Sequence, residues 1–191
     1  MCIRDSIYTN SWASIDLEKE AAESLIADGC VLISQHADTT GASTACEKAG
    51  VPIVGYNVSM IATAPTQALT SASIDWGPYY TYAVKSVIDG TKIDTDWCKG
   101  YDDGADKITE LNDKAIAKGT KEKVKEVEDA IKDGSLHVFD TSTFTVDGKE
   151  LDSWKDDNGN EYIKDGYFHE SELHSAPAFA INIDGIESVE K

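Results

Sequence analysis

The sequence has few positive charges and no long apolar run, and each shortage argues against a class of function. Lys and Arg number 17 against 35 Asp and Glu, which gives a formal net charge of −18 over 191 residues. Nucleic acids and anionic membranes are bound through Lys and Arg, so this charge argues against both as partners. No stretch reaches the ~20 apolar residues of a membrane-spanning helix. The hydrophobic fraction of 41% is still enough for a folded core.

Cysteine is also scarce, with four residues in the chain. Cys30, Cys46 and Cys98 have no metal-like spacing, and we predict neither a metal nor a cofactor. We interpret Cys30 and Cys46 as buried thiols; a disulfide between them is the less favoured alternative. The fourth, Cys2, lies in residues 1–6, which fit no strand or helix pattern and lack an apolar signal-peptide core. We interpret residues 1–6 as a non-native leader.

Strands and helices are predicted to alternate over the first half of the chain. Strands are expected at residues 7–9, 30–34, 51–55 and 69–74, and the run 30–34 is apolar enough for a strand buried on both faces. Helices are expected at 16–27, with Leu17 among its inward residues, at 41–48, and at 81–89 after a corner made by Gly77 and Pro78. This alternation predicts an α/β fold, a parallel sheet with helices on both faces.

Polar or aromatic residues follow four of these strands. Parallel sheets bind ligands outside the carboxyl ends of their strands, so these residues are expected at one rim. The candidate ligand-binding residues are Asn10, Trp12, His36, Asp38, Asn57, Asp75 and Trp76.

Each candidate has a functional and a structural interpretation. Trp12 and Trp76 could sandwich a flat heterocycle, since stacking on a base contributes ~1–3 kcal/mol, or they could simply cover the surface. His36 and Asp38 could hydrogen-bond a base edge or a hydroxyl, although a histidine beside a buried strand is more often structural.

The amide of Asn57 can donate and accept at once. Asp75 could contact a ligand, but capping the helix that follows is the favoured role.

The second half of the chain has a different character. A charged amphipathic helix is expected at 120–132, short strands at 136–139 and 144–146, and a hairpin over 151–163 that turns at Asn158-Gly159. Residues 178–184 alternate like a half-buried strand. Residues 169–174 and 156–161 resemble a zinc-protease motif and a calcium loop, but their spacings fit neither metal site.

The motifs Asn10-Ser11-Trp12, Gln35-His36-Ala37-Asp38, Gly55-Tyr56-Asn57 and Ala64-Pro65, followed by residues 69–80, occur in an order and spacing that resemble one family. They are similar to the second lobe of the basic membrane protein family, substrate-binding lipoproteins of ABC importers that bind purine nucleosides and bases. The resemblance covers about the first two thirds of the chain and implies one lobe of a type I periplasmic-binding-protein fold.

On this basis we expect a ligand-binding lobe at residues 7–100. Residues 101–146 would be a hinge segment that crosses into a first lobe, and residues 147–191 a C-terminal β-rich extension. The resemblance also implies an extracytoplasmic, cell-surface location, a lipid anchor and most of a first lobe upstream, an ABC permease as partner, and no enzymatic activity.

Two positions depart from the family pattern. Where nucleoside-binding relatives have an Asp and a Lys that contact the ligand, this chain has Asn57 and Ile74. With the residues Asp75-Trp76-Gly77-Pro78 that follow, this favours a bare base such as adenine over a nucleoside. Two alternatives are a nucleoside hydrolase that uses Asp38, Asp75 and His36, and a surface ligand sensor without a transport partner.

Overall fold

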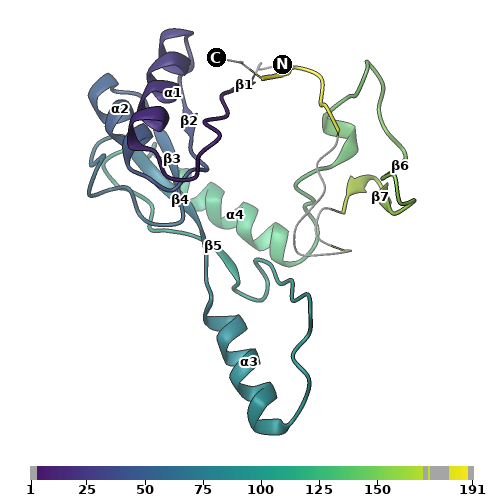
Figure 1. Cartoon of the computed structure of the whole chain (residues 1–191). Coiled ribbons are helices and arrows are strands. Elements are labelled where there is room, and N and C mark those ends of the chain that lie inside the picture. Colours follow the sequence, from purple (N-terminus) through teal and green to yellow (C-terminus); the bar gives the residue numbers. More distant parts are fainter. Residues whose placement is uncertain (1–3, 170–171, 173–180, 189–191) are drawn as a thin grey trace. The chain divides into compact units, whose positions relative to one another are not determined.

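The computed structural model describes residues 4–169, 172 and 181–188, and these residues form two units (Figure 1). The first, which we call the sheet unit, comprises the described residues within 4–75, 106–125 and 187–188. The second, the hairpin unit, comprises those within 76–105 and 126–186. None of the described helices is long and apolar enough to cross a membrane.

The sheet unit is built on the predicted parallel sheet. Strands β2 (Ile33–Ser34), β3 (Ile53–Tyr56) and β4 (Ala68–Ile74) pair in parallel, in the order β2-β3-β4. A strand that the sequence did not predict, β5 (Asp106–Ile108), adds an antiparallel edge to β4. A further two-stranded sheet joins β1 (Arg4–Ser6) to β9 (Ile186–Ser188). The α/β class with a parallel sheet and helices is therefore confirmed.

Two predicted helices of the sheet unit are confirmed to within one residue. Helix α1 (Ile15–Ala27) begins after Ser14, whose hydroxyl accepts a hydrogen bond from the Leu17 amide at 3.4 Å, as an N-cap should. Helix α2 (Gly41–Ala49) ends at Gly50, which is left-handed with φ 71°. The two helices lie together on one side of the sheet (Figure 1).

The core of the sheet unit lies between this helix pair and the strands. Its buried residues are mostly small: Ala22, Ile33, Ala42, Ala45, Cys46, Ile53, Met60, Ala64 and Ala68. Small side chains let helices approach closely, and at Gly41 a Cβ would clash with the Ile15 carbonyl. Burial raises the pKa of the Cys46 thiol to about 11. Cys30 and Cys46 are both free, so the alternative disulfide is not formed.

Several details of the sheet unit differ from the prediction. Residues 7–9 form a loop rather than a strand. Strand β2 begins only at Ile33, which pairs with Ile53, the first residue of its neighbour β3. Residues before Ile33 therefore have no partner in β3, and Val31 is 82% exposed. The prediction of a strand buried on both faces is therefore wrong for residues 30–32. Leu17, predicted to face inward, is 44% exposed, and Glu18 is buried instead.

The hairpin unit begins with α3 (Gly77–Asp89), where the predicted corner is in fact the first turn of the helix. Pro78 suits that turn because its missing N–H would have no intrahelical partner there. Helix α4 (Thr120–Lys132), which ends in this unit, has the predicted bounds.

The predicted hairpin is present as β6 (Trp154–Lys155) and β7 (Glu161–Lys164), which β8 (Tyr167–Phe168) extends. The carboxylate of Asp156 accepts from the amides of Asn158 and Asn160, which fixes the turn.

Three other predicted strands do not appear in the described residues. Residues 136–139 and 144–146 form no strand; the 3-10 helix η1 (Thr141–Thr143) lies between them, and isolated bridges join Asp140 to Tyr167 and Val146 to Lys149. Of the strand predicted at 178–184, residues 178–180 lie outside the described residues and 181–184 are not in a strand.

Candidate functional site

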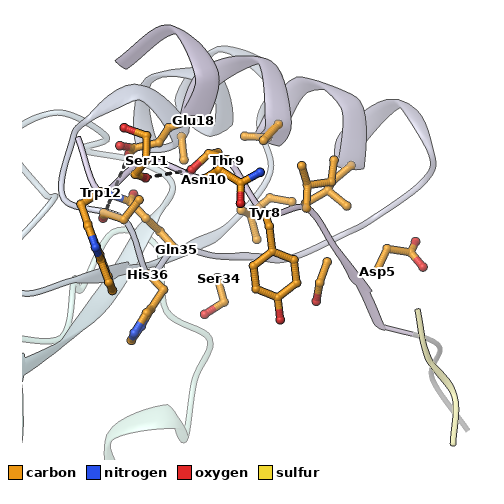
Figure 2. A pocket seen from close by; sticks show the side chains of 18 residues that line it. Asp5, Tyr8, Thr9, Asn10, Ser11, Trp12, Glu18, Ser34, Gln35 and His36 are labelled. Carbon is orange, nitrogen blue, oxygen red and sulfur yellow. Dashed lines mark hydrogen bonds between the residues drawn. The ribbon is translucent and has the colours of Figure 1, made fainter. Parts of the chain in front are cut away.

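A cavity of about 680 Å³ opens in the sheet unit between β1, the loop 7–14, helix α1 and the end of β2, and Asp5 and Ser6 of the predicted leader belong to its lining. Its floor is apolar, with Ala21, Ala22, Leu25 and Ile33, and its mouth is polar and aromatic. In Figure 2 Glu18 lies at the top of the view, near Ser11 and above Trp12, and Gln35, His36 and Ser34 lie lower, with Tyr8 to their right. A cavity of this size with an apolar floor and a few polar groups is typical of small-molecule sites.

The loop that carries Trp12 is held by its own backbone. Asn10 adopts a left-handed conformation with φ 52°, which asparagine tolerates better than most residues. The Thr9 hydroxyl donates to the Ser11 carbonyl at 2.9 Å. The Asp38 amide donates to the Trp12 carbonyl at 2.8 Å, which joins this loop to the loop after β2. The Trp12 side chain is 69% exposed at the mouth of the cavity, although its backbone is fixed.

His36 is the centre of a row of three aromatic rings. Its ring centroid lies 4.5 Å from that of Tyr56, with 43° between the planes, and 6.3 Å from that of Trp12, with 52° between the planes. The row therefore presents ring faces and edges at the carboxyl ends of β2 and β3, where a planar ligand can stack.

The other candidates from the sheet unit follow the neighbouring strands. Asn57 follows β3 and has a φ of 67°. Its backbone N–H donates to the Ala72 carbonyl at 2.6 Å, and its backbone carbonyl accepts from the Ser73 hydroxyl. The Asp75 carboxylate, after β4, accepts from the Lys107 ammonium at 2.7 Å. Since β2, β3 and β4 are parallel, His36, Asn57 and Asp75 follow corresponding ends of adjacent strands.

The structure therefore brings together only some of the predicted residues. Asn10, Trp12 and His36 line the cavity, and Asp38 adjoins it through its backbone, whereas Asn57 and Asp75 lie outside the lining. Trp76 belongs to the hairpin unit, where its ring meets Tyr79 edge-on at 6.3 Å.

Four residues of the site were missed by the sequence reasoning. Tyr8 was assigned to a strand. Tyr56 follows a predicted strand, the same signal that identified His36, but it was not chosen as a binding residue. Gln35 is buried beneath the His36 loop, and Glu18 is buried on α1. The spacing of Ser14 and Glu18, one residue longer than a capping box, is the signal that could have identified Glu18.

The comparisons with known proteins agree with this arrangement. A family model described as ABC transporter substrate-binding protein PnrA-like matches residues 5–137. A purine-binding protein of Brucella abortus is 33% identical over 144 residues, which are 75% of this chain and 41% of that protein. A putative ABC transporter glucose-binding protein of Haloferax volcanii is 29% identical over 145 residues, or 75% of this chain and 37% of that protein.

Two solved structures share the fold. A solute-binding protein of an ABC transporter system from Conexibacter woesei matches with a TM-score of 0.53 and 21% identity, over 69% of this chain and 44% of that one. A transcriptional activator of the comK gene from Bacillus halodurans matches with a TM-score of 0.60 and 15% identity, over 69% and 47%.

The chain spans about two fifths of the length of the curated relatives it matches. The family match covers strands β2 to β5, the cavity and the aromatic row, and it places this chain in the family of PnrA-like substrate-binding proteins of ABC transporters.

Proposed function

We propose that this chain forms one wall of the ligand cleft of an extracytoplasmic solute-binding protein, which captures a purine base or nucleoside and delivers it to an ABC permease. The proposed protein is held at the cell surface by a lipid anchor. Its mechanism is capture by closure of two lobes around the ligand.

The observation that carries the proposal is the aromatic row Trp12, His36 and Tyr56 beside the cavity. A purine is planar and aromatic, and stacking of a base on such rings contributes ~1–3 kcal/mol. Polar groups beside the rings, among them Asn10 and Ser34, can hydrogen-bond the edge of the base. The name of the Brucella relative, a purine-binding protein, supports the same ligand class.

Of the three groups that a hydrolase would use, Asp75 already accepts from Lys107 at 2.7 Å. Asp75 also lies outside the residues that line the cavity, so the three groups do not meet at one site. This arrangement favours binding over hydrolysis.

The test is a titration of the isotope-labelled 191-residue chain with adenine, followed by NMR. We expect dissociation constants in the millimolar range, because one lobe supplies half of a cleft, and shifts confined to the Trp12 indole, the His36 ring and their neighbours. Trp12→Ala and His36→Ala should each weaken binding about tenfold, which is the loss of one stacking partner. Trp97→Ala, which removes an aromatic ring of the hairpin unit, is the matched control and should leave the affinity unchanged.

Two results would contradict the proposal. Absence of shifts with adenine and adenosine at millimolar concentration would remove purines as ligands. A response to glucose alone would favour the second candidate, a sugar, which the name of the Haloferax relative supports and which aromatic rings can also bind.

A further inference from the structure

Glu18 is a carboxylate buried beside the cavity, with 3% of its surface exposed. One oxygen, Oε1, accepts from the Ser14 amide at 3.3 Å. The other, Oε2, accepts from the Thr39 amide at 3.2 Å. Gln35 Nε2 lies 3.4 Å from Oε2, but its two hydrogens have shorter acceptors in the Ala37 and Thr39 carbonyls. Figure 2 shows Glu18 above Trp12, with Gln35 and His36 lower in the view.

This carboxylate is buried without a cation. Among the side chains that the structure describes, Glu18 has no ion-pair partner, and its hydrogen bonds come from neutral N–H groups. Burying an ionised group is costly unless donors replace the lost water, and two backbone N–H donors together with the positive end of α1 supply that compensation. A Leu at this position would carry no such cost, so the carboxylate is better explained by what it connects.

The two donors belong to the two segments that carry the site, and Gln35 lies beside them. Ser14 ends the loop that holds Asn10 and Trp12, and Gln35 and Thr39 lie on either side of His36 and Asp38. Gln35 Nε2 also donates to the Ala37 carbonyl at 2.7 Å, which closes the turn around His36. The bond from the Asp38 amide to the Trp12 carbonyl at 2.8 Å is a second link between the same segments.

We propose that Glu18 is a positioning residue: it ties the Trp12 loop to the His36 loop and so holds the two rings in place before the ligand binds. The inference rests on the proposed function of the site. A site whose side chains are already ordered does not lose their conformational entropy on binding, and this gain appears directly as affinity. Glu18 would thus set affinity through the two loops that it connects.

The variant that tests this is Glu18→Gln, which keeps the shape but replaces one oxygen by an NH₂ group. That NH₂ faces N–H donors, so one link between the loops is lost. We expect adenine affinity to fall about tenfold, as for freeing two side chains. We also expect the Thr39 or Ser14 amide to exchange with solvent several-fold faster, with unchanged exchange in β3 and β4.

Two controls separate positioning from stability. Glu20→Gln makes the same chemical change at an exposed residue of the same helix and should change neither property. Ile53→Val removes one buried methyl group from the core beneath the site; it should lower the melting temperature at least as much as Glu18→Gln while leaving adenine affinity intact. Equal affinity of the Glu18→Gln and Glu20→Gln variants would overturn the proposal, and so would an affinity loss shared with Ile53→Val.

The exchange measurement keeps this inference separate from the proposed function. If the unmodified chain binds no purine, the proposed function fails, yet slow exchange of Thr39, relieved in Glu18→Gln, would still support the link between the loops. If the Glu18→Gln variant does not fold, the exchange rate of the Thr39 amide in the unmodified chain still tests the link between the loops. A Thr39 amide that exchanges as fast as an exposed loop amide would overturn the link itself.

Discussion

The two units treat their apolar residues in opposite ways. In the sheet unit nine hydrophobic side chains form one buried cluster, and five of them are alanines. In the hairpin unit, α3 has a clear apolar stripe, yet Val87 is 70% exposed and Ile88 is 77% exposed, and Ser86 is its one buried residue. The same kind of sequence pattern has therefore produced a core in one unit and a solvent-facing stripe in the other.

The difference shows that periodicity predicts the helix but not the partner. A helix forms because its residues favour it and its ends are capped, as Gly90 does for α3 with φ 68°. Burial also requires a second surface of complementary shape, which small residues such as Ala42 and Ala45 provide between α1 and α2. The hairpin unit builds its own core elsewhere, from Tyr162, Ile163 and Phe168 of the C-terminal sheet.

The largest expected effect is a contrast between core and stripe. Ile53→Ala should lower the free energy of unfolding by about 3 kcal/mol, because Ile53 is fully buried and its removal leaves a cavity. Val87→Ala should change it by less than about 0.5 kcal/mol. Urea unfolding followed by NMR signals from each unit measures both, and a cost near that of Ile53→Ala for Val87→Ala would show that the α3 stripe is covered in solution.

A pair of glycine substitutions tests the same contrast at the backbone. Gly41→Ala should cost about 2 kcal/mol, because the new methyl group would meet the Ile15 carbonyl where α2 approaches α1. Gly100→Ala in the hairpin unit meets only the flexible Asp102 side chain, at 3.7 Å, and should be close to neutral. Equal costs, measured by thermal unfolding, would mean that the close approach of the helices is not rigid.

The predictable parts of the fold were those with local causes. The helix ends at Gly50 and Gly90 follow from glycine after an apolar repeat, and the hairpin turn follows from Asn158-Gly159. The failures had distant causes. The length of β2 depends on where β3 begins, twenty residues later, and residues 30–32 offer no local sign of that limit.

The candidate site divides in the same way. Trp12 and His36 were identified because a parallel sheet places strand ends at one rim, and the cavity lies beside them. Glu18 was not recognised, because a glutamate in the first turn of a helix is usually solvated and its spacing from Ser14 is a weak local signal. Its burial depends on Gln35 and Thr39, which approach it only in the folded chain.

Acid should affect the units in opposite directions, by a smaller amount than the core substitutions. In the hairpin unit, the Thr145 hydroxyl and the Gly148 amide lower the pKa of Asp184 below its usual 3.8. The contribution of Asp184 to the stability of the fold is therefore fully present above pH 3.8 and is lost as the pH falls through the folded pKa. In the sheet unit, burial raises the pKa of Asp106, so its ionisation opposes folding as the pH rises through the folded pKa.

NMR titration of the two carboxyl carbons gives both midpoints. The midpoint of Asp184 should lie below 3.8 and that of Asp106 above it. Asp184→Asn should remove only the share of the acid loss that Asp184 contributes, because the pKa values of Asp133, Asp140, Asp156 and Glu172 in the same unit are also lowered. A midpoint of Asp184 at or above the usual value would contradict its role as an acceptor.

The smallest expected effect concerns one exposed ion pair in each unit. Lys107 pairs with Asp75 at 2.7 Å in the sheet unit, and Lys164 pairs with Glu172 at 2.7 Å in the hairpin unit. Exposed pairs contribute about 0.2–1 kcal/mol, and salt screens them. Lys107→Met should therefore cost no more than about 0.5 kcal/mol at low salt and almost nothing at high salt.

Lys164→Met should cost slightly more, because Glu172 also accepts from His169 Nδ1 at 2.7 Å and so belongs to a small network. Thermal unfolding at two salt concentrations separates the cases. A cost for Lys107→Met that persists in high salt would show that the Asp75–Lys107 pair is part of the rigid sheet unit rather than its solvated edge. The contrast between the units would then extend from their cores to their surfaces.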